Sequence, residues 1–215
     1  MGFDKLMVPL AGQPLLSHTL RAFEDCAVIT GILLVCDPLR EGEFRDLSKR
    51  YGIKKLLACV PSGQERRDSV WNGILAAGEN ADYLAVHDGA RPLITPRLIA
   101  NCIQAAIQYG SACLAEPVAD TIHRANGKKV LTETLSREGL WRMQTPQSFR
   151  RSDLLEAYAR LIQENATATD EASVFLRIGK QVFIEEADDW NFKITLPRDL
   201  ALAEIIFSGR KKGTL

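Results

Sequence analysis

The chain has 215 residues, enough for one well-buried domain, and its 27 Lys and Arg residues balance its 27 Asp and Glu residues. A net charge of zero excludes bulk electrostatic attraction to nucleic acid or to an anionic membrane, so any phosphate recognition must be local. No apolar run is long enough to span a bilayer and no signal peptide is recognisable, which favours a cytoplasmic protein. Five cysteines without CxxC spacing indicate small core residues rather than a zinc site: Cys26, Cys36, Cys59, Cys102 and Cys113.

The first half of the chain alternates β-rich apolar runs with helical patterns. Apolar residues recur at helical spacing over 13–25, 41–51, 66–78 and 96–109, and strand-like runs lie near 29–35, 56–60, 83–86 and 113–115. This alternation predicts an α/β fold with a mostly parallel sheet flanked by helices on both faces. Because the sequence has no internal repeat and no low-complexity segment, we expect a single domain over residues 1–215.

Residues 121–145 interrupt this alternation. Extended segments at 121–124 and 129–134 flank Asn126-Gly127, and Asn-Gly between extended segments is a strong hairpin signal. A hairpin inserted into an α/β chain often projects from the body, so this one is interpreted either as an arm that contacts a second copy or as an ordinary surface hairpin.

The last third of the chain returns to the core. Residues 151–164 are predicted to form a helix and residues 181–186 a strand. Residues 191–195 alternate polar and apolar side chains, which predicts that Lys193 shares one face of a strand with Asn191 and Thr195. Pro197 is then expected to open a final helix, since the first helical position favours proline.

The most informative segment for function is 83–92, where an apolar strand ends in His87-Asp88-Gly89-Ala90-Arg91-Pro92. Open α/β sheets bind ligands at the carboxyl ends of their strands, and a carboxylate, a glycine and an arginine there suit a phosphate-bearing substrate. The alternative is a polar strand-to-helix turn that Pro92 ends. His87 is interpreted as packed or hydrogen-bonded rather than as an acid–base group.

Two further segments each allow a functional and a structural interpretation. The loop at 61–70 contains Gly63 and two arginines before a helix, which fits recognition of a nucleotide base or sugar, or simply a capped helix. Thr169-Asp170-Glu171 stands at another helix start, where capping is a sufficient explanation, although Thr169 is also able to present its hydroxyl to a ligand. The GxGxxG, GxxxxGK[ST] and GxSxG patterns are absent, which argues against classical dinucleotide, P-loop and α/β-hydrolase sites.

Taken in order, the motifs resemble the 2-C-methyl-D-erythritol 4-phosphate cytidylyltransferase family, over essentially the whole chain. The matching segments are Asp4-Lys5, Leu10 to Leu16, Ser62 to Arg66, Asp68-Ser69-Val70, His87 to Pro92, Pro117 to Thr121, Gly139-Leu140-Trp141, Thr145-Pro146-Gln147, Thr169 to Ser173 and Lys193-Ile194-Thr195. The resemblance implies a Rossmann-like nucleotide-diphospho-sugar transferase fold with a protruding arm. It also implies transfer of the cytidylyl group of CTP to the phosphate of 2-C-methyl-D-erythritol 4-phosphate, with release of pyrophosphate, in non-mevalonate isoprenoid biosynthesis.

The resemblance further implies roles for individual residues. Lys5 would stabilise the pentavalent transition state, while Arg137 and Lys193 would hold the sugar phosphate for in-line attack. The polyol-phosphate pocket would be lined by Asp88, Arg91, Thr121, Thr145 and Thr169. The cytosine and ribose would be bound by Gly63, Gln64 and Ser69, with Ala90 nearby. Mg²⁺ would be held mainly through the CTP phosphates, with no metal-ligating residue expected, and the arm would cross a homodimer to bring Arg137 and Thr121 to the neighbouring site.

One departure from the family pattern concerns the beginning of the sequence. The family starts with a strand and a loop of the form Ala-Ala-Gly-x-Gly-x-Arg-Met, whose backbone amides hold the triphosphate, whereas this sequence begins at Met1, where that loop ends. Two explanations compete: a start assigned at an internal methionine, which we favour, or a truncated form. In either case we expect the chain beginning at Met1 to bind CTP weakly and to catalyse slowly, and restoring the segment to raise turnover.

Two other functions also fit the sequence. Ribitol-5-phosphate cytidylyltransferases have the same fold and chemistry with a linear pentitol acceptor, although the Ala90-Arg91-Pro92 sequence favours the erythritol enzyme. A non-catalytic nucleotide or sugar-phosphate binding protein is the alternative of another class. Against it stands the presence of Lys5, Arg137 and Lys193, three separated cations that a binding protein has no chemical need to keep.

Overall fold

A computed structural model describes residues 4–79, 81–187 and 190–213. Its centre is a four-stranded sheet in which β10 and β6 are parallel, while β9 runs antiparallel to both of its neighbours, β6 and β5. The strands, in the order β10-β6-β9-β5, are Phe183–Glu186, Ser111–Pro117, Trp141–Arg150 and Tyr83–Val86. A mixed sheet therefore replaces the mostly parallel one expected from the strand–helix alternation.

The other described strands form separate small sheets. β3 (Ile32–Cys36) and β4 (Leu56–Pro61) make a parallel pair, and β1 (Pro9–Leu10) and β2 (Gln13–Pro14) make a short antiparallel pair. The prediction of an α/β fold is confirmed, but that of one mostly parallel sheet is wrong. The physical reason is β9, which follows the arm and inserts antiparallel between β5 and β6.

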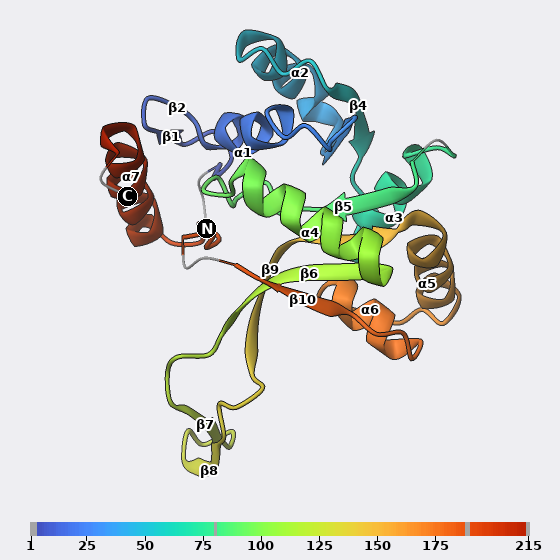
Figure 1. The fold of residues 1–215 in the computed structure, drawn as a ribbon, viewed down its shortest axis with the longest axis vertical. Helices are drawn as coiled ribbons and strands as arrows, with labels where there is room; N and C mark the ends of the chain where they lie inside the picture. The colour runs from blue at the N-terminus through green and yellow to red at the C-terminus, as the bar shows by residue number, and fades with distance from the viewer. Residues whose placement is uncertain (1–3, 80, 188–189, 214–215) are drawn as a thin grey trace.

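Helices cover both faces of the four-stranded sheet (Figure 1). Ala112 and Leu114 on β6 pack in the cluster formed with α4, whereas Cys113, between them, packs with Tyr158 and Phe175 in the cluster formed with α5 and α6. This is the alternation that a strand buried on both faces requires. The helices are α1 (Leu15–Glu24), α2 (Glu41–Arg50), α3 (Arg66–Ala76), α4 (Pro96–Tyr109), α5 (Arg151–Gln163), α6 (Glu171–Arg177) and α7 (Pro197–Lys212), with a 3₁₀ turn at Pro38–Arg40.

No helix within the described ranges is long and apolar enough to cross a bilayer. The five cysteines are free thiols, four of them buried and Cys59 partly so, as expected for small core residues.

The predicted hairpin forms and projects from the body as an arm (Figure 1). Its strands, β7 (Ile122–Ala125) and β8 (Leu131–Leu135), are antiparallel. The turn is wider than the two-residue Asn-Gly turn: the Asn126 side chain accepts from the amides of Lys128 and Val130, and Lys129 adopts the left-handed conformation at φ 62°. An asparagine side chain that bonds its own turn explains why this position initiates the hairpin.

Residues 145–147, for which no element was predicted, lie inside the buried strand β9. The segment before Pro197 differs from the element predicted for it. Residues 191–195 are not assigned to a strand, and Asn191 is fully buried while Lys193 is exposed, so the two do not share a face as predicted. Pro197 does open α7, and β5 and α4 begin and end at the predicted residues.

Candidate active site

Three charged side chains meet at the carboxyl end of β5. Asp88 Oδ2 lies 3.2 Å from Arg91 Nε and 3.3 Å from Lys193 Nζ. Arg91 is 9% exposed and also donates from Nη1 to the carbonyl oxygen of Asn191 at 2.8 Å, whereas the Lys193 side chain is 46% exposed. Because one cation is anchored and the other is open to solvent, this cluster presents a solvent-exposed ammonium beside a fixed carboxylate.

The segment that carries Lys193 is held in place by buried polar contacts rather than by a sheet. Asn191 Nδ2 donates to Gln144 Oε1 at 2.8 Å and to the carbonyl oxygen of Thr145 at 2.9 Å. The Ile194 amide donates to the carbonyl oxygen of Ala90 at 2.8 Å. These bonds connect residues 191–194 to β9 and to the loop after β5, which explains how Lys193 reaches Asp88 although about a hundred residues separate them.

The electrostatics of the cluster favour an ionised carboxylate. Burial alone raises the pKa of Asp88, but Lys193 and Arg91 outweigh it, so the pKa stays below its ordinary value. A carboxylate between two cations accepts hydrogen bonds and donates none, which suits a hydroxyl-bearing ligand. The same two cations suit the phosphate of such a ligand.

The side chains of His87 and Thr145 hold the loop that carries Asp88 in place. The Thr145 hydroxyl oxygen accepts from the Asp88 amide at 3.1 Å and lies 3.0 Å from His87 Nδ1, while the His87 ring lies 4.9 Å from that of Phe23. Burial lowers the pKa of His87 to about 4. The packed, hydrogen-bonded role predicted for His87 is therefore confirmed, and Thr145 touches the loop through its hydroxyl.

The first described residues lie against the same loop. Lys5 stands in a turn in which the Met7 amide donates to the carbonyl oxygen of Asp4 at 3.2 Å. A methyl group of Leu6 lies 3.4 Å from where a Cβ on Gly89 would be, and the Leu16 amide donates to the carbonyl oxygen of Leu6 at 2.9 Å. The structure thus brings the Lys5 segment next to Gly89.

The loop between β4 and α3, residues 62–65, is called the Gly63 loop below. The Gly63 amide donates to Ser69 Oγ at 3.0 Å, and Ser69 Oγ donates to the carbonyl oxygen of Glu65 at 3.1 Å. A Cβ on Gly63 would lie 2.2 Å from that of Asp68, so only glycine fits here. Gln64 is exposed at the tip, and Ser69 holds the loop against the first turn of α3.

Thr169 is exposed immediately before α6, and Asp170 caps that helix by accepting from the Ser173 amide at 2.9 Å. Sequence reasoning missed the next residue, Glu171, which is fully buried and pairs with Arg66. It also missed Gln147, which donates to Asp170 Oδ2 at 3.0 Å and accepts from the Ala172 amide at 2.9 Å. The residue types alone gave no signal, because both look like ordinary surface side chains.

The arm residues are not drawn into the cluster. Arg137 donates to the carbonyl oxygen of Ala119, and Thr121 is exposed just before β7. Within the described residues their contacts lie in the arm and its base, so this single chain brings Lys193, Asp88, Arg91 and Thr145 together but not Arg137 or Thr121.

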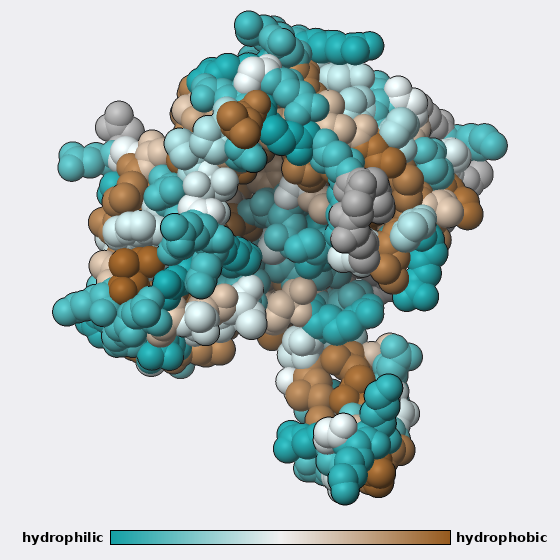
Figure 2. Space-filling model, turned by 180° about the vertical axis from the view of Figure 1, so that it is seen from behind, coloured by the Kyte–Doolittle hydropathy of each residue, from teal (hydrophilic) through white to brown (hydrophobic). Residues whose placement is uncertain are grey.

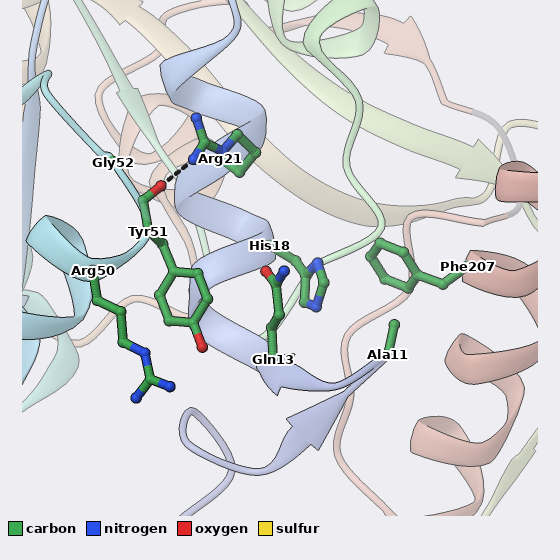
Figure 3. Close-up of a pocket in the computed structure, with 8 residues that line it drawn as sticks. All are labelled: Ala11, Gln13, His18, Arg21, Arg50, Tyr51, Gly52 and Phe207. Atoms are coloured by element: carbon green, nitrogen blue, oxygen red, sulfur yellow. Dashed lines mark hydrogen bonds between the residues drawn. The ribbon is translucent and has the colours of Figure 1, made fainter.

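A cavity of about 590 Å³ lies elsewhere, between α1, the end of α2, the β1–β2 turn and α7 (Figure 3). None of the predicted site residues lines it. Its Arg21 donates to the carbonyl oxygen of Tyr51 and pairs with Asp25 at 3.8 Å, while Arg50 stacks on the Tyr51 ring. Arg21 thus serves to cap α2, and the cavity is not the predicted site.

Figure 2 shows a separate hollow on the face seen from behind, with hydrophilic residues gathered at its centre and the arm extending below.

Comparison with known families gives one match over nearly the whole chain. The model of the 2-C-methyl-D-erythritol 4-phosphate cytidylyltransferase family matches residues 1–209. A protein of that name from Pelotomaculum thermopropionicum is 42% identical over 208 residues, covering 96% of this chain and 87% of its own. Another from Geobacillus thermodenitrificans is 40% identical over 209 residues, covering 97% of this chain and 91% of its own.

Solved structures agree with these sequences. The crystal structure of 2-C-methyl-D-erythritol 4-phosphate cytidylyltransferase from Thermus thermophilus superposes with a TM-score of 0.81 at 31% identity, covering 95% of this chain and 94% of that one. The 4-diphosphocytidyl-2C-methyl-D-erythritol synthase of Anaerococcus prevotii gives a TM-score of 0.87 at 22% identity over 96% of this chain and 91% of that one, a likeness that concerns the fold alone.

Proposed function

The chain belongs to the 2-C-methyl-D-erythritol 4-phosphate cytidylyltransferase family, and on that premise we propose how its residues carry out the reaction. The activity is transfer of a cytidylyl group to 2-C-methyl-D-erythritol 4-phosphate in the non-mevalonate isoprenoid pathway. An oxygen of the acceptor phosphate attacks the α-phosphorus of CTP; the new P–O bond forms as the bond to the β-phosphate breaks, and pyrophosphate leaves. The observation that carries the proposal for the site is the Asp88, Arg91 and Lys193 cluster at the carboxyl end of β5.

The acceptor side of the reaction is assigned to this cluster. The acceptor phosphate is already ionised at neutral pH, so the protein needs to position it and to balance charge rather than to remove a proton. Lys193, with its exposed ammonium, binds the phosphate, and Asp88 accepts from the hydroxyls of the polyol. Arg91 fixes Asp88, and Thr145 and Thr169 complete the polyol-phosphate pocket.

The nucleotide side is assigned to the Gly63 loop and to the start of the chain. Glycine lets the backbone of a loop approach a ligand closely, and the side-chain amide of Gln64 both donates and accepts hydrogen bonds, as the polar edge of a base requires. Gly63 and Gln64 therefore bind the cytosine and ribose, Ser69 supports the loop, and Ala90 lies nearby. Lys5 stabilises the charge that develops at the α-phosphate.

The arm supplies residues to a second copy in this proposal. Val130 and Leu131 expose 57% and 64% of their surfaces on the arm, and apolar side chains exposed on a thin projection favour a protein contact. A homodimer built through the arm would bring Arg137 and Thr121 to the neighbouring acceptor pocket. There, Arg137 would share the phosphate with Lys193.

The described residues do not form a magnesium site built from protein ligands alone. The carboxylate nearest the proposed acceptor phosphate, Asp88, is already paired with two cations. Among the described residues no three His, Cys, Asp or Glu side chains group as metal ligands. We therefore assign Mg²⁺ to the triphosphate of the incoming CTP.

The test is pyrophosphate release with CTP and Mg²⁺, using 2-C-methyl-D-erythritol 4-phosphate as acceptor and ribitol 5-phosphate as control. The proposal expects release that requires the erythritol acceptor and falls by on the order of 100-fold in Lys193→Met, which keeps the length of the side chain and removes its charge. Binding of CTP without release would favour a binding protein. Equal release with ribitol 5-phosphate would contradict the choice of acceptor.

A further inference from the structure

An ion pair between a half-buried arginine and a fully buried carboxylate joins the helix that follows the Gly63 loop to the helix that follows Thr169. Glu171 is 0% exposed, and its two carboxylate oxygens accept from Arg66 Nη1 at 2.7 Å and from Arg66 Nη2 at 2.9 Å. Tyr158 on α5 donates its hydroxyl to the same carboxylate at 2.9 Å. Arg66 opens α3 and Glu171 opens α6, so a single pair of side chains ties the starts of two helices together.

The contacts with Glu171 outweigh the cost of partly burying Arg66. Burial lowers the pKa of Arg66, but hydrogen bonds and attraction from Glu171 outweigh it and raise the pKa above its ordinary value, with Asp88 contributing in the same direction. A parallel, bidentate Arg–carboxylate pair also fixes the relative orientation of its two partners, which a single contact does not.

The pair lies between the two proposed substrate segments. Arg66 follows Gln64 by two residues, and Glu171 follows Thr169 by two residues. The α6 start is held in addition by Gln147, which bonds Asp170 and the Ala172 amide. These contacts link the loop assigned to the nucleotide to the helix start that carries Thr169.

We propose that Glu171 is a positioning residue that, through Arg66, fixes the Gly63 loop relative to Thr169 and thereby couples the binding of CTP to the binding of the polyol phosphate. This inference rests on the function proposed above for those two segments. Coupling is reciprocal, so whichever substrate binds first strengthens the binding of the other by the same factor. An ion pair that served stability alone would not change that factor.

The first experiment measures binding by calorimetry in the full chain. CTP and 2-C-methyl-D-erythritol 4-phosphate are each titrated alone and then with the other at saturation. Glu171→Gln keeps the shape but loses the charge, and Arg66→Gln/Glu171→Gln removes both charges and so leaves no unpaired buried ion. We expect both variants to weaken CTP binding by on the order of tenfold and to bring the coupling factor close to one.

The second experiment follows amide hydrogen exchange in peptides that cover residues 62–69, which needs no ligand. We expect faster exchange there in both variants. Arg177→Gln is the matched control, because Arg177 at the end of α6 makes an exposed ion pair in which Nε and Nη2 donate to one oxygen of Glu164 at 3.0 and 2.7 Å. It should change neither the exchange of residues 62–69 nor the coupling factor.

The outcomes separate this inference from the proposed function. A wild type that binds neither substrate contradicts the proposed function, and the exchange data still test the effect of Glu171 on the Gly63 loop. Unchanged exchange over 62–69 in both variants overturns the positioning role. Faster exchange with an unchanged coupling factor also overturns the inference, because the pair then serves only the local structure.

Discussion

The pKa of His87 predicts a specific loss of stability in acid. The ring packs near Phe23, and its Nδ1 lies 3.0 Å from the Thr145 hydroxyl, whose oxygen already accepts from the Asp88 amide at 3.1 Å. The other ring nitrogen, Nε2, lies 3.4 Å from the carbonyl oxygen of Arg91, which only accepts, so the neutral ring carries its proton on Nε2 and Nδ1 accepts from the Thr145 hydroxyl. Protonation of the ring would turn Nδ1 into a donor, so that the Thr145 hydroxyl would have to rotate, and would place a positive charge in the packed loop that carries Asp88.

The magnitude follows from linkage. Folding lowers the pKa of His87 from 6.5 to about 4, so the unfolded chain binds its proton first as the pH falls. Stability is therefore complete above pH 6.5 and declines below it, by about 2 kcal/mol at pH 5 and about 3 kcal/mol at pH 4. A loss of about 3 kcal/mol is a large part of the net stability of a typical domain.

The assay is urea unfolding of the wild type, His87→Gln and His123→Gln at several pH values between 4.5 and 7.5. Since the glutamine at position 87 does not titrate, we expect the free energy of unfolding of His87→Gln to fall less than that of the wild type as the pH is lowered. The difference between the two proteins should match the losses given above. His123 stands on the arm, where its Nδ1 contacts Thr134, so His123→Gln should follow the wild type. Parallel curves for the wild type and His87→Gln would refute this reasoning. So would an NMR titration that places the pKa of the His87 imidazole near 6.5.

Three further changes follow from the site. Gly63→Ala places a Cβ 2.2 Å from that of Asp68, so CTP affinity measured by calorimetry should fall at least tenfold, while Gly42→Ala, with open space around it, should leave that affinity unchanged. Asp88→Asn should weaken binding of the polyol phosphate by about tenfold and spare CTP, and equal losses for both ligands would argue against its acceptor role. Leu131→Asp on the arm should lower the dimer fraction in sedimentation, and an unchanged oligomeric state would argue against the arm as the contact.

Local sequence signals predicted the elements that are defined by their own residues, through helix caps or a short apolar run. The helix over 96–109 has Thr95 as its cap, Pro96 at its first position and Gly110 at its end, so its boundaries could be read directly from the sequence. The strand at 83–86 is a short apolar run between polar segments, and the structure has it at the same residues. In both cases one local property decides the structure.

The strand β9 shows why the topology could not be predicted in the same way. It carries Pro146 and four polar residues that are buried: Gln144, Thr145, Gln147 and Ser148. A proline and a polar run both argue against a central strand when only local sequence is considered. The strand is stable because its polar side chains are paired with Asn191, His87 and the start of α6, all of them distant in sequence.

The same reasoning explains which parts of the site escaped prediction. Polar residues at strand ends and in glycine loops, such as Asp88 and Gln64, stand where ligands bind in α/β folds and could be proposed from position. Glu171 carries no such signal, because an acidic residue at a helix start is fully explained by the helix dipole. Its burial arises only when α3 and α6 pack together and Arg66 meets it, so its role depends on a contact between segments 105 residues apart. Residues that position other residues are defined by such long-range pairs, and in this chain the structure was needed to find them.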